Sequence, residues 1–237
     1  DYYASRGLGD VYKRQILDTA HEFLDLGLPY EIDPIKLEGH NDYFFPMAST
    51  IKFHFPKRGS MPPVDVTWYD GVNNIPPVPE GYGVSELDPN IPLVAGGKIQ
   101  PAKLNPGKII YSKDLIFKGG THSSPLHIIP EEKAKALSSK LPEVPKSTSN
   151  HHENFLLACM GKEKARSPFE IFGPLNQMFS LGVMAQRMNT KLLFDRKTKE
   201  ITNNPFANAL LVGEPPRKGW EEFYNCLLYT SPSPRDA

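Results

Sequence analysis

The stretch that decides the fold runs from residue 49 to residue 69, where STIKFHF (49–55) and VDVTWY (64–69) flank the turn PKRGSMPP. Every second residue of both segments is apolar: Ile51, Phe53 and Phe55 in the first, and Val64, Val66 and Trp68 in the second. Strict alternation predicts strands with one buried face. A turn built from glycine and prolines predicts that the two strands run antiparallel.

More β-like segments lie on both sides of this hairpin. The segment 30–37 also alternates, but its Pro34 suits a sheet edge or a bulge. Short strands are expected at 108–111, 114–117, 125–129 and 190–194. Residues 71–107 are rich in proline, glycine and asparagine, and a loop of this length is usually functional or mobile. It is expected to cover a pocket or to embrace a neighbouring subunit.

Helical patterns open the chain and fill its second half. Residues 16–26 carry an apolar stripe, and Gly27 with Pro29 should end that helix. Further helices are expected after the starting residues Pro130, Asn150 and Pro174, and over 203–211. Strands first and helices afterwards predict an α+β fold, with a large, mostly antiparallel open sheet covered on one face by helices.

Both ends of the chain read as translated sequencing adapter. SRGLGDVYKRQ (5–15) back-translates to a transposon-type adapter, and CLLYTSPSPRDA (226–237) reads as its reverse complement in another frame. We therefore interpret 1–15 and 226–237 as adapter-derived, disordered tails, and 16–225 as one domain cut from a longer reading frame. With the natural N-terminus missing, the sequence leaves the compartment open between cytoplasm and periplasm.

Composition narrows the classes of partner. Lys plus Arg and Asp plus Glu number 27 each, which argues against nucleic acid and against an anionic membrane surface. No apolar run reaches the roughly 18–20 residues that span a bilayer. Cys159 is alone outside the tails, so no disulfide or thiolate metal site is expected. Neither a G-x-G-x-x-G nor a P-loop motif occurs.

Six blocks of sequence carry a family resemblance. In chain order they are ILDTAHEFLDLGLP, FPMASTIKFHFPKRGSMPPVDVTWYDG, FKGGTHSS, NHHENFLLAC, FGPLNQMFSLGVMAQRMNTKLLFD and ITNNPFANALLVGEPPRKGWEEFY. Together they resemble the C-terminal part of the glucose–fructose oxidoreductase / inositol dehydrogenase / MocA family, in its bacterial NADH-dependent dehydrogenase branch. The resemblance covers nearly all of 16–225.

This resemblance implies a reaction and two separate domains, one for the cofactor and one for the substrate. Such proteins move a hydride between a sugar or polyol carbon and NAD or NADP, and a base handles the hydroxyl proton. An N-terminal Rossmann domain, absent from this chain, would hold the cofactor. We therefore expect no cofactor binding and no activity from the chain alone. The sheet is expected to support the substrate pocket and a homo-oligomer interface. If the opening helix normally packs at the junction with the missing domain, the isolated chain should associate or aggregate.

The resemblance also points to catalytic residues. The family's D-x-x-x-H-x-x-D pattern leads into the opening helix, so Asp18 matches its last aspartate and the histidine falls on Gln15. Asp18 and His21 are the catalytic candidates at the edge of the active site. Asp18 could instead be an acid near the start of a helix, and His21 a residue packed near the domain junction.

Four residues of the sheet region are candidates for substrate binding: Trp68, Tyr69, His54 and His122. An oligomer interface is the alternative use of these side chains, and core packing is the alternative for Trp68.

Two other functions stay open at this point. The parent could be an NAD-dependent glycosidase of the same family, which ends in net hydrolysis. The chain could also be a non-enzymatic carbohydrate-binding or assembly module.

Overall fold

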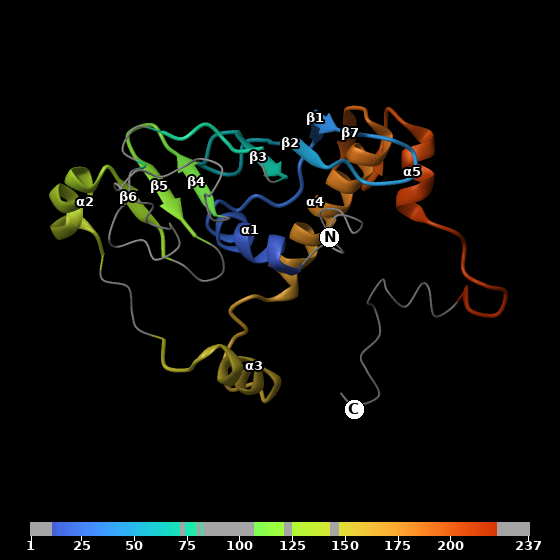
Figure 1. Cartoon of the computed structure of the whole chain (residues 1–237). Coiled ribbons are helices and arrows are strands. Elements are labelled where there is room, and N and C mark those ends of the chain that lie inside the picture. The colour runs from blue at the N-terminus through green and yellow to red at the C-terminus, as the bar shows by residue number, and fades with distance from the viewer. Residues whose placement is uncertain are drawn as a thin grey trace.

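The computed structural model of the chain describes residues 11–71, 74–79, 82, 107–120, 125–142 and 147–221, with the side chains of 11–15 left aside. Most of the long segment 71–107, and the adapter-like residues 1–10 and 226–237, lie outside the described residues. The fold is a mixture of helices and antiparallel sheet, as the α+β pattern predicts (Figure 1).

A five-stranded sheet forms the centre of the molecule, and every strand pair in it is antiparallel. Its spatial order is β3 (Val64–Asp70), β2 (Ala48–Phe55), β1 (Glu31–Glu38), β7 (Leu192–Asp195) and β8 (Glu200–Ile201). The predicted hairpin is confirmed, with Phe53 opposite Val66. The register of β1 against β2 shifts between Pro34 and Lys36, which confirms a bulge at the proline.

Three further strands form a second sheet: β4 (Lys108–Tyr111), β5 (Ile116–Gly119) and β6 (His127–Ile129). The described strands therefore lie in two sheets, where the sequence pattern suggested one large sheet. Helix α2 (Glu131–Leu137) packs against β6 and is followed by the short 3-10 helix η3 (Ser138–Lys140).

Helices cover one face of the five-stranded sheet. Helix α4 (Phe169–Met188) packs against β1, β2 and α1 (Val11–Phe23), and α5 (Pro205–Val212) packs against β8 and α4 (Figure 1). Two starts differ from the pattern: α1 begins five residues before residue 16, and α4 begins five residues before Pro174. Pro174 lies inside α4. Its nitrogen carries no hydrogen, so it cannot make the usual helical hydrogen bond to the carbonyl four residues earlier.

The core lies between the sheet and these helices. Ile51, Phe53 and Phe55 are at most 1% exposed, and the ring of Trp68 meets the ring of Phe179 of α4 edge-on, with centroids 5.8 Å apart. Ile16, Leu17 and Ala20 of α1 are buried in the same layer, whereas Phe23 is 71% exposed. Most of the apolar stripe of α1 is thus already covered by α4. No helix among the described residues is long and apolar enough to span a membrane.

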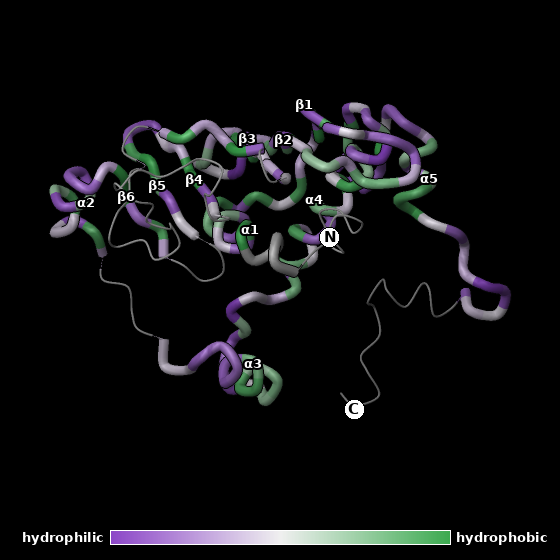
Figure 2. Tube along the Cα trace, viewed as in Figure 1, coloured by the Kyte–Doolittle hydropathy of each residue, from purple (hydrophilic) through white to green (hydrophobic). Residues whose placement is uncertain are grey.

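Helix α3 (His151–Cys159) stands apart from the other elements (Figure 1). Its start carries a complete capping box, in which the Asn150 side chain accepts from the amide of Glu153 and the Glu153 carboxylate accepts from the amide of Asn150. The capping box confirms Asn150 as the N-cap. Part of this helix is apolar in Figure 2, and Phe155, Leu156 and Met160 on and beside it are exposed.

Candidate functional site

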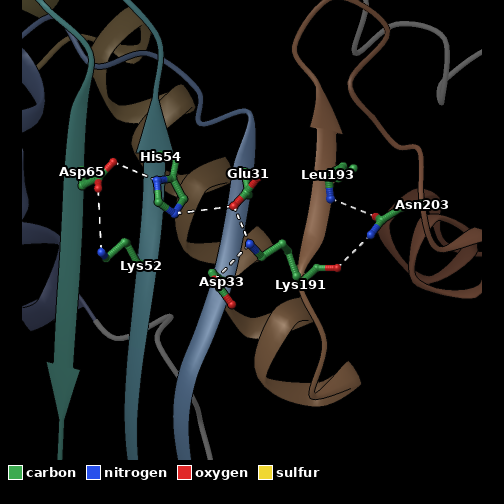
Figure 3. A network of polar contacts seen from close by, with 8 residues as sticks. All are labelled: Glu31, Asp33, Lys52, His54, Asp65, Lys191, Leu193 and Asn203. Carbon is green, nitrogen blue, oxygen red and sulfur yellow. Dashed lines mark hydrogen bonds and ion pairs between the residues drawn. The ribbon is translucent and has the colours of Figure 1, made fainter.

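Two groups of polar side chains contain three of the predicted site residues, Asp18, His21 and His54. The first, the α1 cluster, consists of Asp18, His21, Lys108 and Ser167. The second, the polar-face cluster, lies on the open face of the five-stranded sheet and consists of Glu31, Asp33, Lys52, His54, Asp65 and Lys191 (Figure 3).

Asp18 lies in the C-terminal half of α1 and is half-buried. The hydroxyl of Ser167, which precedes α4, donates to its carboxylate at 3.4 Å from Oδ1 and 3.5 Å from Oδ2. Both contacts are long, so Ser167 restrains the carboxylate weakly. Asp18 therefore keeps most of its capacity to accept another hydrogen bond.

Lys108, the first residue of β4, brings a buried cation to the α1 cluster. It is 7% exposed, and its ammonium donates to the carbonyl of Gly120 at 3.3 Å. Burial lowers the pKa of Lys108, and the negative charge of Asp18 opposes that shift. The carboxylate of Asp18 thus lies close enough to influence the charge of a partly desolvated ammonium, although the two groups form no ion pair.

Sequence reasoning missed Lys108 as a site residue. The sequence offered one hint, the glycines at 107 and 119 that mark a close approach of two backbones beside Lys108. In the structure, a Cβ at Gly107 would lie 2.5 Å from the carbonyl oxygen of Gly119. The β4 and β5 backbones approach so closely there that side chains other than hydrogen are excluded. Its charge partner, however, lies 90 positions earlier in the chain, and no local pattern joins the two.

His21 is 4% exposed, and its Nε2 is 2.9 Å from the carbonyl oxygen of Gly27. Because a carbonyl only accepts, Nε2 carries the hydrogen and Nδ1 is free of one in the neutral ring. Burial lowers the pKa of His21, while the bond to Gly27 and the charges of Asp18 and Asp25 raise it. The bond fixes the turn after α1, where Gly27 has a φ of +62°. A role for His21 at an active-site edge stays a prediction.

The polar-face cluster is built by strand alternation. Residues opposite one another on β1, β2 and β3 place Glu31 beside His54 and His54 beside Asp65. The imidazole Nδ1 of His54 is 2.8 Å from Asp65 Oδ1, and its Nε2 is 3.7 Å from Glu31 Oε1 (Figure 3). One imidazole thus lies between carboxylates on both neighbouring strands.

Lysines complete this cluster from both sides. The ammonium of Lys191, just before β7, lies 2.8 Å from Glu31 Oε1 and 3.2 Å from Asp33 Oδ2. These contacts raise the pKa of Lys191, with the hydrogen bond to Glu31 as the largest cause. Lys52 lies 3.8 Å from Asp65 Oδ2. The cluster is a continuous chain of polar contacts that runs over β3, β2 and β1 to Lys191, just before β7.

The four substrate-binding candidates do not gather at one place. Trp68 is 9% exposed on the core face, where it packs on Phe179, and its indole Nε1 has no hydrogen-bond partner among the described residues. Tyr69 is half-buried on the opposite face, across from Thr50. His54 shares that face, as a member of the polar-face cluster. His122 lies outside the described residues.

Comparison with protein-family models gives no match to this chain, and comparison with curated proteins gives none either.

Proposed function

We propose that residues 16–225 are the substrate-binding and oligomerisation domain of an NAD(P)-dependent oxidoreductase that acts on a sugar or polyol. The order of the six sequence blocks supports the family assignment. The chemical part is supported by the carboxylate of Asp18, whose negative charge acts on the buried ammonium of Lys108 without a direct ion pair between them.

In this proposal the α1 cluster receives the reacting end of the substrate. Asp18 accepts a hydrogen bond from a substrate hydroxyl, and the Lys108 ammonium stabilises negative charge on that oxygen as its proton leaves. The two groups come from α1 and β4, so the placement of the second sheet relative to the first helix sets the distance between them. His21 holds the end of α1 in place through Gly27.

A Rossmann-type dinucleotide site does not fit the described residues of this chain. Dinucleotide sites lie at the carboxyl ends of parallel strands, behind a glycine-rich turn. All strand pairs that the structure describes are antiparallel, and the sequence has no such turn. The proposal therefore gives cofactor binding to a separate N-terminal domain of the longer protein, and no step through the cofactor is assigned to this chain.

The exposed apolar side chains of α3 agree with a place in a larger assembly. Phe155, Leu156 and Met160 are each at least 60% exposed, beside a helix that packs on no other described element. In the proposal, the cofactor domain or a second subunit covers them.

Two experiments test the proposal. Titration of the chain with NADH, followed by cofactor fluorescence, should show no binding; micromolar binding would contradict a separate cofactor domain. Reading the gene upstream of the codon for Ile16 should reveal a Rossmann segment in frame with it. An upstream region without a glycine-rich strand–turn–helix would exclude the oxidoreductase and leave a non-enzymatic module.

A further inference from the structure

We propose that Glu31, Asp33 and His54 form a binding site for one divalent transition metal ion of the zinc class, on the open face of the five-stranded sheet. The site is independent of the function proposed above. It rests on three observations: the spacing of the ligand atoms, the orientation of the imidazole, and the charge balance of the cluster.

The ligand atoms are already close together. One oxygen each from Glu31 and Asp33 and one ring nitrogen of His54 all lie within 4.8 Å of one another. In a tetrahedral zinc site with bonds of about 2.0–2.1 Å, two ligand atoms are about 3.3 Å apart. The 3.7 Å between His54 Nε2 and Glu31 Oε1 is near this spacing. Small side-chain rotations would therefore close the site without a change in the backbone.

The imidazole is oriented as in a metal site. Asp65 Oδ1 lies 2.8 Å from Nδ1 of His54 and accepts the hydrogen on that nitrogen. Nε2 is thereby turned towards Glu31, and it makes no hydrogen bond with the described residues. A carboxylate that holds the second nitrogen of a histidine is the usual support of a metal-bound imidazole. Figure 3 shows this line of side chains across β3, β2 and β1.

The charges of the cluster leave room for a cation. Three carboxylates, those of Glu31, Asp33 and Asp65, face two ammonium groups, those of Lys52 and Lys191. Three negative charges less two positive charges leave one negative charge among the carboxylates and ammonium groups. All three ligand side chains are 28% exposed or less, which limits competition from water.

Lys191 occupies the place of the ion. Its ammonium bridges Glu31 and Asp33, the two oxygen ligands, and it is 48% exposed on a flexible stem. A metal ion would displace this ammonium into solvent at little cost, because exposed ion pairs contribute little. Three protein ligands would leave one coordination position for water or for a group from a partner. One imidazole with two carboxylates suits zinc, and cobalt(II) can replace zinc as a spectroscopic probe.

The test is a titration of the chelator-treated chain with Zn²⁺ by calorimetry, and with Co²⁺ by visible absorption. We expect one ion per chain at micromolar affinity or better, and the strong visible bands of four-coordinate cobalt. H54Q should weaken binding at least about 100-fold, and D65N, which removes only the orienting carboxylate, about 10- to 100-fold. K191M removes the competing ammonium and should tighten binding about five- to tenfold.

Matched controls separate this site from nonspecific histidine binding. The double variant H151Q/H152Q removes two exposed histidines of α3 and should bind zinc as the parent does. Far-UV circular dichroism of each metal-free variant checks the fold, and E31Q gives a second ligand variant if H54Q is unstable. The proposal is overturned if the parent binds no zinc at micromolar concentration, if H54Q and E31Q both bind like the parent, or if K191M weakens binding. Such results would leave a closed network of ion pairs.

Discussion

The two faces of the five-stranded sheet are made by alternating residues of the same strands, yet they follow different physical rules. On the core face, Phe53 and Ile51 have no exposed surface and meet α4. On the polar face, the side chains of the intervening residues Lys52 and His54 are 35% and 19% exposed and form ion pairs, and the His54 ring also lies near that of Tyr30. The same strand therefore supplies stability on one side and binding chemistry on the other.

The difference between the two faces indicates where substitutions should lower the free energy of unfolding most. Apolar burial contributes about 25 cal/mol for each Å² removed from water, and close packing makes each missing methylene felt. Exposed ion pairs contribute about 0–1 kcal/mol each, because water and salt screen them. Substitutions on the core face should therefore lower the free energy of unfolding more than substitutions on the polar face.

The largest effect is expected at Phe53. Phe53→Ala removes a fully buried ring between the sheet and α4, so it should lower the free energy of unfolding by about 3–5 kcal/mol. Urea denaturation followed by circular dichroism measures this change. Phe53→Leu, which keeps most of the volume, should cost clearly less. Equal losses in both variants would mean that ring packing does not set the stability of this face.

A polar contact inside the core face should matter next. Gln186 of α4 is 2% exposed, and its amide nitrogen donates to the hydroxyl of Ser49 at 2.6 Å. Gln186→Ala leaves Ser49 unpaired and opens a small cavity, so it should cost about 2–3 kcal/mol. Gln186→Met keeps most of the volume, loses the bond and also removes the buried Oε1, which has no partner among the described residues; in the same denaturation assay it should cost at most about half as much. If the two variants are equally unstable, the hydrogen bond and not the cavity explains the loss.

His21, a buried residue of α1, should make the free energy of unfolding depend on pH. Burial lowers its folded pKa below the ordinary value of 6.5. Between the two pKa values the unfolded state binds more protons, so the free energy of unfolding rises with pH until it levels off above about 6.5. Thermal melts across pH 5–8 should show that the parent loses more stability than His21→Gln as the pH falls below about 6.5. Parallel profiles would show that His21 does not carry this dependence.

The smallest effect on stability is expected on the polar face. Glu31→Gln breaks the contacts with Lys191 and His54, yet it should change the free energy of unfolding by less than about 1 kcal/mol. The same variant should abolish tight zinc binding. A loss as large as that of Phe53→Ala would erase the contrast between the faces.

Much of the fold follows from alternation in the sequence. The period-two pattern of 49–55 and 64–69 predicts the hairpin and its buried face, and Pro34 marks the bulge in β1. Local signals of this kind depend on a few neighbouring residues. The predicted starts of α1 and α4 were less accurate, because where a helix begins depends on packing between α1 and α4 as well as on capping residues.

The candidate sites were harder to predict because their members are far apart in sequence. Asp18 and Lys108 are 90 positions apart, and the charge of one acts on the other only through the fold. Lys191 reaches Glu31 only because β7 pairs with β1, across 160 positions. Alternation indicates which face a residue occupies, but the neighbouring strand decides what it contacts. His54 was therefore a candidate from the sequence, while its partners were not.

The central claim, that this chain is the substrate domain of a nicotinamide-dependent oxidoreductase, is tested most directly by one kinetic comparison. The uninterrupted reading frame that contains 16–225 is expressed, and the oxidation of a panel of polyols and sugars by NAD or NADP is followed through reduced-nicotinamide absorbance. Asp18→Asn should lower kcat/KM about 100-fold or more. The control Asp25→Asn, the same change in the exposed turn after α1, should stay within about twofold, because asparagine tolerates the φ of 45° at that position. No oxidation of any substrate, or equal activity of both variants, would contradict the account.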